Sequence, residues 1–181
     1  LDIKNLDDSI TLNGLDTAGG ELSVYEKNLS DGSSPNTPAL TQTGTFTVTA
    51  PDGLQTLSVG GINVVSGGVA ATFPQTATTP LGNTLTVTGY NASTGVVTYS
   101  YTLLDNEAHP NAGGINSLTE SFTVTATDTD GSTSSGSLDV NIVDDVPTAV
   151  ADTNASVATE AATVLTGNVL TNDVQGADRV T

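Results

Sequence analysis

The carboxylates of this sequence collect in four places, where their oxygen atoms could bind a metal ion. The clusters are Glu26, the run Asp105-Asn106-Glu107, the pair Asp128 and Asp130, and the pair Asp144-Asp145. Calcium in proteins takes six to eight oxygen ligands from carboxylates, amides and backbone carbonyls. The same residue types are also common at turns and strand ends with no ion bound. Calcium binding and plain solvated turns are therefore the two interpretations that the sequence offers.

Catalytic chemistry has little support in the sequence. His109 is the only histidine, and its place in a polar loop between Ala108 and Pro110 predicts an exposed side chain. The chain has no cysteine, so thiol chemistry is excluded and zinc-type sites lack ligands. No nucleophile motif such as GxSxG occurs, and the absence of Trp argues against a sugar-binding cleft. We expect neither an enzyme nor a small-molecule substrate.

The charge of the chain limits its partners. Twenty acidic residues face only three Lys and Arg, which gives a formal net charge of −17. Nucleic acids need basic patches for their phosphates, and anionic membrane surfaces attract basic segments, so neither partner is expected. No run approaches the ~20 apolar residues of a membrane-spanning helix, and no signal-peptide pattern is visible. Bound divalent cations or salt would limit the self-repulsion of so many carboxylates.

Alternation of apolar and polar residues predicts the strands that must position these clusters. The clearest hairpin joins residues 84–90 to residues 96–103. Leu85 and Val87 of its first strand are natural cross-strand partners for the two tyrosines of its second strand.

A second hairpin carries two of the four acidic clusters. Residues 122–126 and 138–142 alternate and are joined by a turn that contains Asp128 and Asp130, and Asp144 follows the second strand. Further strands are expected at 9–13, 21–26, 43–50 and 54–59. With roughly eight to ten strands, antiparallel connections throughout and no helix, we predict an all-β protein with an immunoglobulin-like antiparallel β-sandwich.

The composition changes after Pro147, which predicts a domain boundary. Residues 1–147 are expected to form the β-sandwich module. Residues 148–181, rich in Ala, Thr and Asp, are expected to be a linker and the first strand or strands of a following module, with one strand at 164–170. That strand could alternatively add to an open edge of the first module. The opening LDIKNLDD is typical of a segment taken from a longer chain.

Several stretches together resemble one repeat of a known protein family. These are ITLNGLDTAGGELSVYEKN, LTQTGTFTVTAPDGLQTLSVGG, NTLTVTGYNASTGVVTYSYTLLDNE and SLTESFTVTATDTDGSTSSGSLDVNIVDDVPTAVAD. They look like an extender repeat of the giant type I-secreted RTX adhesins of Gram-negative bacteria, over about residues 8–155. The resemblance implies an extracellular, cell-surface location and a role in cell attachment and biofilm formation. It also implies tandem repeats stiffened by calcium, with neighbouring repeats of the same polypeptide as partners.

The order of the acidic clusters is also similar to that of a cadherin. There, a strand-borne Glu, an acidic triplet and an acidic linker hold calcium between modules. Carried over to this sequence, the triplet is Leu104–Glu107 and the linker is Asp144-Asp145, with Asp152 and Asn154 completing the site from the next module. The implied metal ligands are Glu26, Asp105, Glu107, Asp144, Asp145 and Asp152. Asp128 and Asp130 are a separate calcium candidate, and they are equally typical of a DxDG turn.

Two functions of different classes remain open at this point. The first is a calcium-stabilised spacer whose function is length and stiffness. The second is a ligand-binding adhesion module that recognises a glycan or a peptide through the loops 28–40 and 105–117. Few aromatic residues, 4% of the chain, argue against the second. Repetition of the same sequence in the parent protein favours the first, and binding of a glycan or peptide by the isolated chain favours the second.

Overall fold

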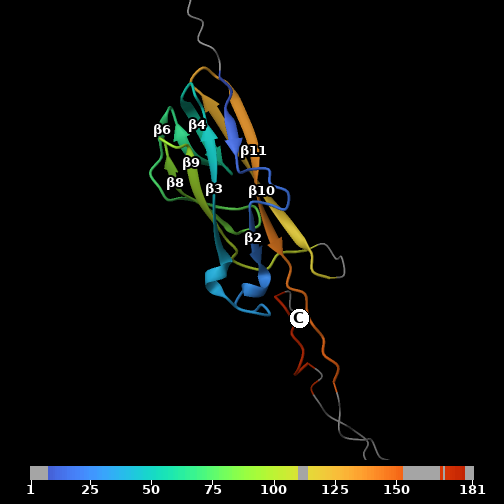
Figure 1. Ribbon diagram of the computed structural model, residues 1–181. Coiled ribbons are helices and arrows are strands. Elements are labelled where there is room, and N and C mark those ends of the chain that lie inside the picture. Colours follow the sequence, from blue (N-terminus) through green and yellow to red (C-terminus); the bar gives the residue numbers. More distant parts are fainter. Residues whose placement is uncertain (1–7, 110–113, 153–167, 169, 178–181) are drawn as a thin grey trace, which may run out of the picture.

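A computed structural model describes residues 8–109, 114–152, 168 and 170–177. These residues form eleven strands in two sheets (Figure 1). The first sheet has the order β1 (Thr11–Asn13), β3 (Thr41–Thr49), β9 (Val96–Thr102), β8 (Thr84–Asn91) and β7 (Gln75–Thr78). The second has the order β2 (Leu22–Tyr25), β11 (Thr133–Val143), β10 (Ser117–Asp128), β4 (Leu54–Val59), β5 (Ile62–Ser66) and β6 (Val69–Ala70). The 3-10 helices η1 (Glu26–Asn28) and η2 (Thr37–Leu40) are the helical turns of the described residues, so the all-β prediction is confirmed.

Both predicted hairpins form, with the predicted cross-strand partners. In β8–β9, Leu85 pairs with Tyr101 and Val87 with Tyr99. The hairpin β10–β11 is longer than the sequence pattern indicates, because its ladder continues in register from Ser117 opposite Val143 to Thr127 opposite Thr133. This long ladder separates the acidic turn at one end of β10–β11 from Asp144 at the other.

The apolar faces of the two sheets form one core. Buried residues of both sheets belong to a single cluster, and the rings of Tyr101 in β9 and Phe122 in β10 meet across the layers with centroids 6.1 Å apart. Phe46 and Tyr99 pack within the first sheet at 6.3 Å. Alternate residues of the longer strands β3, β9, β10 and β11 therefore face the core, as expected for two packed sheets.

One pairing departs from the prediction of antiparallel connections throughout. Strand β2 lies at the edge of the second sheet and pairs in parallel with β11, from Leu22 opposite Val140 to Tyr25 opposite Val143. The prediction was wrong here because periodicity shows which face of a strand is buried and carries no information about which strand lies beside it. The parallel pairing brings the end of β2, and with it Glu26, to the end of β11.

The strands run between two ends of the molecule, which we call the hairpin pole and the exit pole. The hairpin pole holds the β3–β4 turn at residues 50–53 and the β10–β11 turn at residues 129–132, at the top of Figure 1. The exit pole holds the loops 26–40 and 103–109 and the end of β11, from which the chain continues downward in Figure 1.

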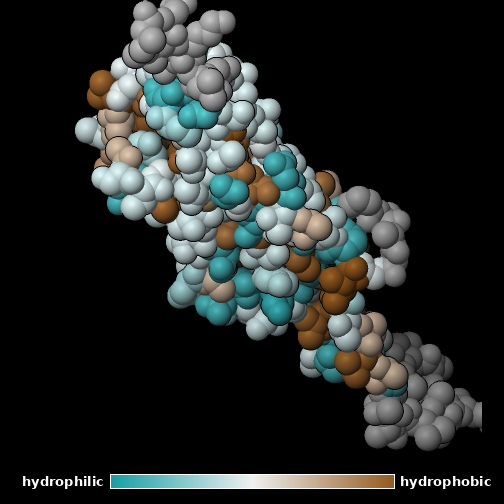
Figure 2. Space-filling model, turned by 45° about the horizontal axis from the view of Figure 1, so that its top comes forward, coloured by the Kyte–Doolittle hydropathy of each residue, from teal (hydrophilic) through white to brown (hydrophobic). Residues whose placement is uncertain are grey.

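The chain beyond the exit pole doubles back on itself. Thr148 and Val174 form an isolated antiparallel bridge with two backbone hydrogen bonds of 2.8 and 3.0 Å. Ala177 is 4% exposed and joins the core cluster. Figure 2 shows apolar residues gathered along this segment, where Val150, Leu170 and Val174 are exposed. Most of the predicted strand at 164–170 lies outside the described residues. Among the described residues, no helix is long and apolar enough to cross a membrane.

Candidate metal centres

Three carboxylates meet at the hairpin pole. Asp52 in the β3–β4 turn, Asp128 at the end of β10 and Asp130 in the following turn offer oxygens that all lie within 4.8 Å of one another. The two turns are tied together, because Thr129 donates its amide to the Gly53 carbonyl at 3.0 Å and its hydroxyl to the Asp52 carbonyl at 2.5 Å. The pattern of the sequence marks Asp128 and Asp130 but not Asp52, which stands in a Pro-Asp-Gly turn with no second acid beside it.

Asp128 is the buried member of this group. It is 1% exposed, and its Oδ1 accepts the amides of Gly131 at 3.0 Å and Ser132 at 2.8 Å. A side-chain hydrogen bond with Asp130, aided by these amides, holds the pKa of the Asp128 carboxyl below its usual value. Its Oδ2 is buried and accepts no hydrogen bond. A divalent cation would satisfy this oxygen, because calcium takes carboxylate oxygens as ligands.

The exit pole brings together a different set of groups. Glu26, His109 and Asp144 offer ligand atoms that all lie within 4.8 Å of one another. Glu26 is fully buried, and its Oε1 lies 3.1 Å from His109 Nε2 and accepts the Glu107 amide at 2.6 Å. The His109 side chain is 3% exposed, so the prediction of an exposed loop histidine is wrong. The ring turns inward onto Glu26, which a polar loop sequence does not reveal.

Four predicted ligands lie outside both groups. Asp105 and Asp152 are exposed. Glu107 is buried, and its Oε1 accepts the Asn83 side chain at 2.6 Å. Asp145 is 6% exposed, and both its carboxylate oxygens accept hydrogen bonds from the loop residue Ser33. Asn154 lies outside the described residues.

Asp145 fastens the long loop between β2 and β3 to the end of β11. Its Oδ2 accepts the Ser33 amide at 2.7 Å and its Oδ1 accepts the Ser33 hydroxyl at 2.5 Å. Hydrogen bonds of this kind, to a charged acceptor, are stronger than neutral ones. The pair therefore holds a loop of the exit pole in place by contacts within the protein.

We expect Ser33→Ala to destabilise the fold by about 1 kcal/mol, because it removes the hydroxyl donor from a buried carboxylate. Denaturant unfolding measures the difference. The neighbouring exposed Ser34 provides the matched control, and Ser34→Ala should change the free energy of unfolding by less than about 0.5 kcal/mol. Equal effects of the two substitutions would contradict this role of Asp145.

Two further acids, Glu107 in the loop 103–109 and Glu120 in β10, are buried. Glu120 is 5% exposed and accepts the Tyr101 hydroxyl at 2.7 Å and the Leu81 amide at 3.0 Å. Burial raises the pKa of Glu107; the Asn83 hydrogen bond opposes this shift, and the charge of Glu120 adds to it. The sequence gives no signal for Glu120 because it stands at an inward position of an otherwise regular strand.

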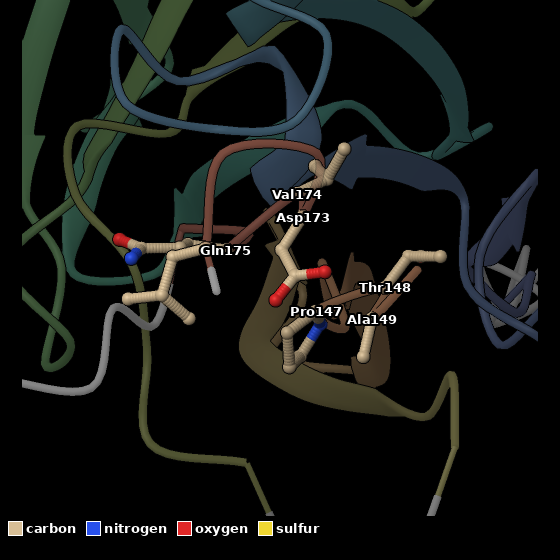
Figure 3. Close-up of a pocket in the computed structure, with 7 residues that line it drawn as sticks. Pro147, Thr148, Ala149, Asp173, Val174 and Gln175 are labelled. Atoms are coloured by element: carbon tan, nitrogen blue, oxygen red, sulfur yellow. The ribbon is translucent and has the colours of Figure 1, made fainter. Parts of the chain in front are cut away.

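A shallow pocket of about 300 Å³ lies on the segment beyond the exit pole. Figure 3 shows its two sides, with Pro147, Thr148 and Ala149 on one segment and Asp173, Val174 and Gln175 on the other. Asp173 accepts the Val150 amide at 2.7 Å, so its carboxylate supports the bridge between the segments. The pocket holds neither of the two acidic groups.

Comparison with protein-family models, with curated proteins and with solved structures finds no match to this chain.

Proposed function

We propose that this chain is a calcium-stabilised spacer module of a bacterial surface adhesin, with an immunoglobulin-like β-sandwich as its fold. The observation that carries the proposal is the position of the two metal-ligand groups. One lies at the pole where the described chain begins, because the amide of Asp8 donates to Asp52 Oδ2 at 2.8 Å. The other includes Asp144, the first residue after β11. Cations at these two positions would stiffen both ends of a module in a tandem array.

The hairpin pole is the better fit to calcium. Its three members Asp52, Asp128 and Asp130 are all oxygen donors, and Asp128 Oδ2 is a buried acceptor with no hydrogen bond. Backbone carbonyls and water complete the shell of a typical calcium site. We propose neighbouring repeats of the same polypeptide as the partners, an extracellular location on the bacterial surface, and no catalytic role.

The immunoglobulin-like part of the proposal rests on the connectivity of the second sheet. An early edge strand, β2, pairs in parallel with the last strand, β11, whereas the other strand pairs of both sheets are antiparallel. The facing sheets and their shared core support the same assignment.

Calcium is expected to raise the melting temperature of the chelated protein. If one site binds with a dissociation constant near 10⁻⁴–10⁻³ M, about 10 mM calcium adds roughly 1.4–2.7 kcal/mol to the free energy of unfolding. For a chain of this length the shift is roughly 3–11 °C per site. Calorimetry in calcium and in EDTA measures it.

Two substitutions test whether the calcium-dependent shift in melting temperature arises at the hairpin pole. Asp130 is exposed, so Asp130→Asn should fold normally and lose the calcium shift of the hairpin pole. Asp105 is also exposed and lies in neither group, so Asp105→Asn should keep the full shift. Identical melting of the unsubstituted protein in calcium and in EDTA would reject calcium stabilisation.

A further inference from the structure

The metal-ligand group of the exit pole contains the imidazole of His109, whereas a typical calcium site has only oxygen ligands. Hydrogen bonds around the ring fix its orientation. Asn116 donates its side-chain amide to Asp144 Oδ2 at 3.0 Å and to the Gly114 carbonyl at 3.3 Å. The opposite orientation of this amide would place its oxygen against a carboxylate. The Asn116 oxygen therefore faces His109 Nδ1, at 3.0 Å.

This arrangement fixes the tautomer of the neutral ring. His109 Nδ1 carries the proton and donates to Asn116, so Nε2 presents its lone pair toward Glu26 Oε1, 3.1 Å away. A hydrogen bond from the second ring nitrogen to a fixed carbonyl is the usual support of a metal-binding histidine. Asn116 supports two ligand residues at once, because the same side chain also holds Asp144.

The remaining atoms of the group point to a cation. Asp144 Oδ1 is buried and accepts no hydrogen bond, since Asn116 binds only the other oxygen. Glu26 is fully buried beside it. A lone pair of Nε2 and two carboxylates thus converge on one place inside the exit pole. In the described part of the chain, Glu26, His109 and Asp144 are the one such group that includes a nitrogen donor.

The donor types select the ion. Calcium prefers oxygen ligands, whereas imidazole suits zinc and the other late first-row transition ions. Zinc bonds of about 2.0–2.2 Å with tetrahedral angles place neighbouring ligand atoms about 3.3–3.6 Å apart. The separation between Glu26 Oε1 and His109 Nε2, 3.1 Å, is slightly shorter than this spacing, so a small outward shift of either side chain would admit the ion. Three protein ligands also leave a fourth position for water or for a group from a neighbouring module.

We propose that Glu26, His109 and Asp144 form a transition-metal site that binds Zn²⁺, with Asn116 as the residue that positions the imidazole and the Asp144 carboxylate. The ion would join the end of β2, the loop after β9 and the end of β11. The inference does not rest on the spacer role, and it assigns to the exit pole a different ion from the hairpin pole.

The single histidine makes the test direct. In chelator-free protein at neutral pH, Zn²⁺ should shift the imidazole proton signals of His109 in NMR spectra and saturate at one equivalent. Calcium alone should leave those signals in place. Glu26→Gln should reduce zinc affinity at least tenfold, and Asn116→Ala, which keeps all three ligands, should weaken it about 10–100-fold. Asp130→Asn, at the other pole, is the matched control and should bind zinc normally.

Two results would overturn the proposal. One is an imidazole spectrum that zinc does not change. The other is equal zinc binding by Glu26→Gln and by the unsubstituted protein, which would mean adventitious surface binding only. Because Glu26 is fully buried, Asp144→Asn at the partly exposed end of β11 serves as a second ligand variant. In the unsubstituted protein, a calcium shift without any response to zinc would reject this site and leave the spacer proposal intact. A response to zinc without a calcium shift would reject calcium stabilisation alone.

Discussion

Alkali is expected to unfold the protein cooperatively as the pH rises from about 10 toward 12. Tyr99 and Tyr101 are 1% and 0% exposed and belong to the core between the sheets. Burial, and then the charge of Glu21, raises the pKa of Tyr99 to about 12. Burial, followed by the hydrogen bond to Glu120 and its charge, raises the pKa of Tyr101 as well.

The raised pKa values of Tyr99 and Tyr101 mean that stability falls as the pH rises. Both tyrosines hold their protons more tightly in the folded state than in the unfolded chain, where the pKa is about 10. Their contribution to stability is therefore complete below about pH 10 and is lost as the pH rises through the folded-state values. Far-ultraviolet circular dichroism and phenolate absorbance, followed together, should change in one transition. Phenolate formation by both core tyrosines in a protein that keeps its β-sheet signal would contradict this account.

Glu120→Ala is expected to lower the free energy of unfolding by about 3 kcal/mol. The substitution leaves the buried Tyr101 hydroxyl and the Leu81 amide without the carboxylate that accepts both. An orphaned buried donor costs about 1–3 kcal/mol. Relief of the repulsion that raises the pKa of Glu107 offsets part of this loss. Urea unfolding at neutral pH measures the net effect.

A double-mutant cycle isolates the hydrogen bond at the centre of this prediction. Tyr101→Phe removes the hydroxyl and leaves one Glu120 oxygen without its donor, so it should also destabilise the protein. The double variant Tyr101→Phe/Glu120→Ala should lose less free energy of unfolding than the sum of the two single changes. It contains neither the hydroxyl nor the carboxylate, so this hydrogen bond leaves no unpaired group behind. Strict additivity would show that the carboxylate and the hydroxyl act independently.

The sequence predicts hairpins well because their partners are close in the chain. The pairing of Leu85 with Tyr101 follows from alternation and a short connection. Strands β5 and β6 are missed because paired glycines on either side obscure their pattern, at 60–61 and 67–68. The parallel β2–β11 pair is missed for a different reason, since its partners are more than a hundred residues apart and share no turn.

The residues of the candidate sites also fall into two kinds: those that local spacing reveals and those that only the pairing of distant strands brings together. The acids of the DxDG turn can be found from local spacing, but Asp52 joins them only through the pairing of β4 with β10. His109 stands in a polar loop, and its burial depends on Glu26 at the end of a distant strand. Asp145 has the composition of a metal ligand, yet both its oxygens are taken by Ser33. Local sequence gives residue type, whereas tertiary pairing decides which oxygens remain free for an ion.

The parallel edge pair has a mechanical consequence. Strand β2 is the second strand of the described chain, after the short β1, and β11 is the last strand before the exit pole. Because the two strands run in the same direction, a force that pulls the beginning of β2 away from the end of β11 slides one strand along the other and loads their ladder in shear. The backbone bonds of Asp16 to Ser137 and of Glu21 to Asp139 extend this contact toward the hairpin pole. These bonds share a load along the strands and must break together rather than one after another, so we expect this edge of the sheet to resist shear more than peeling.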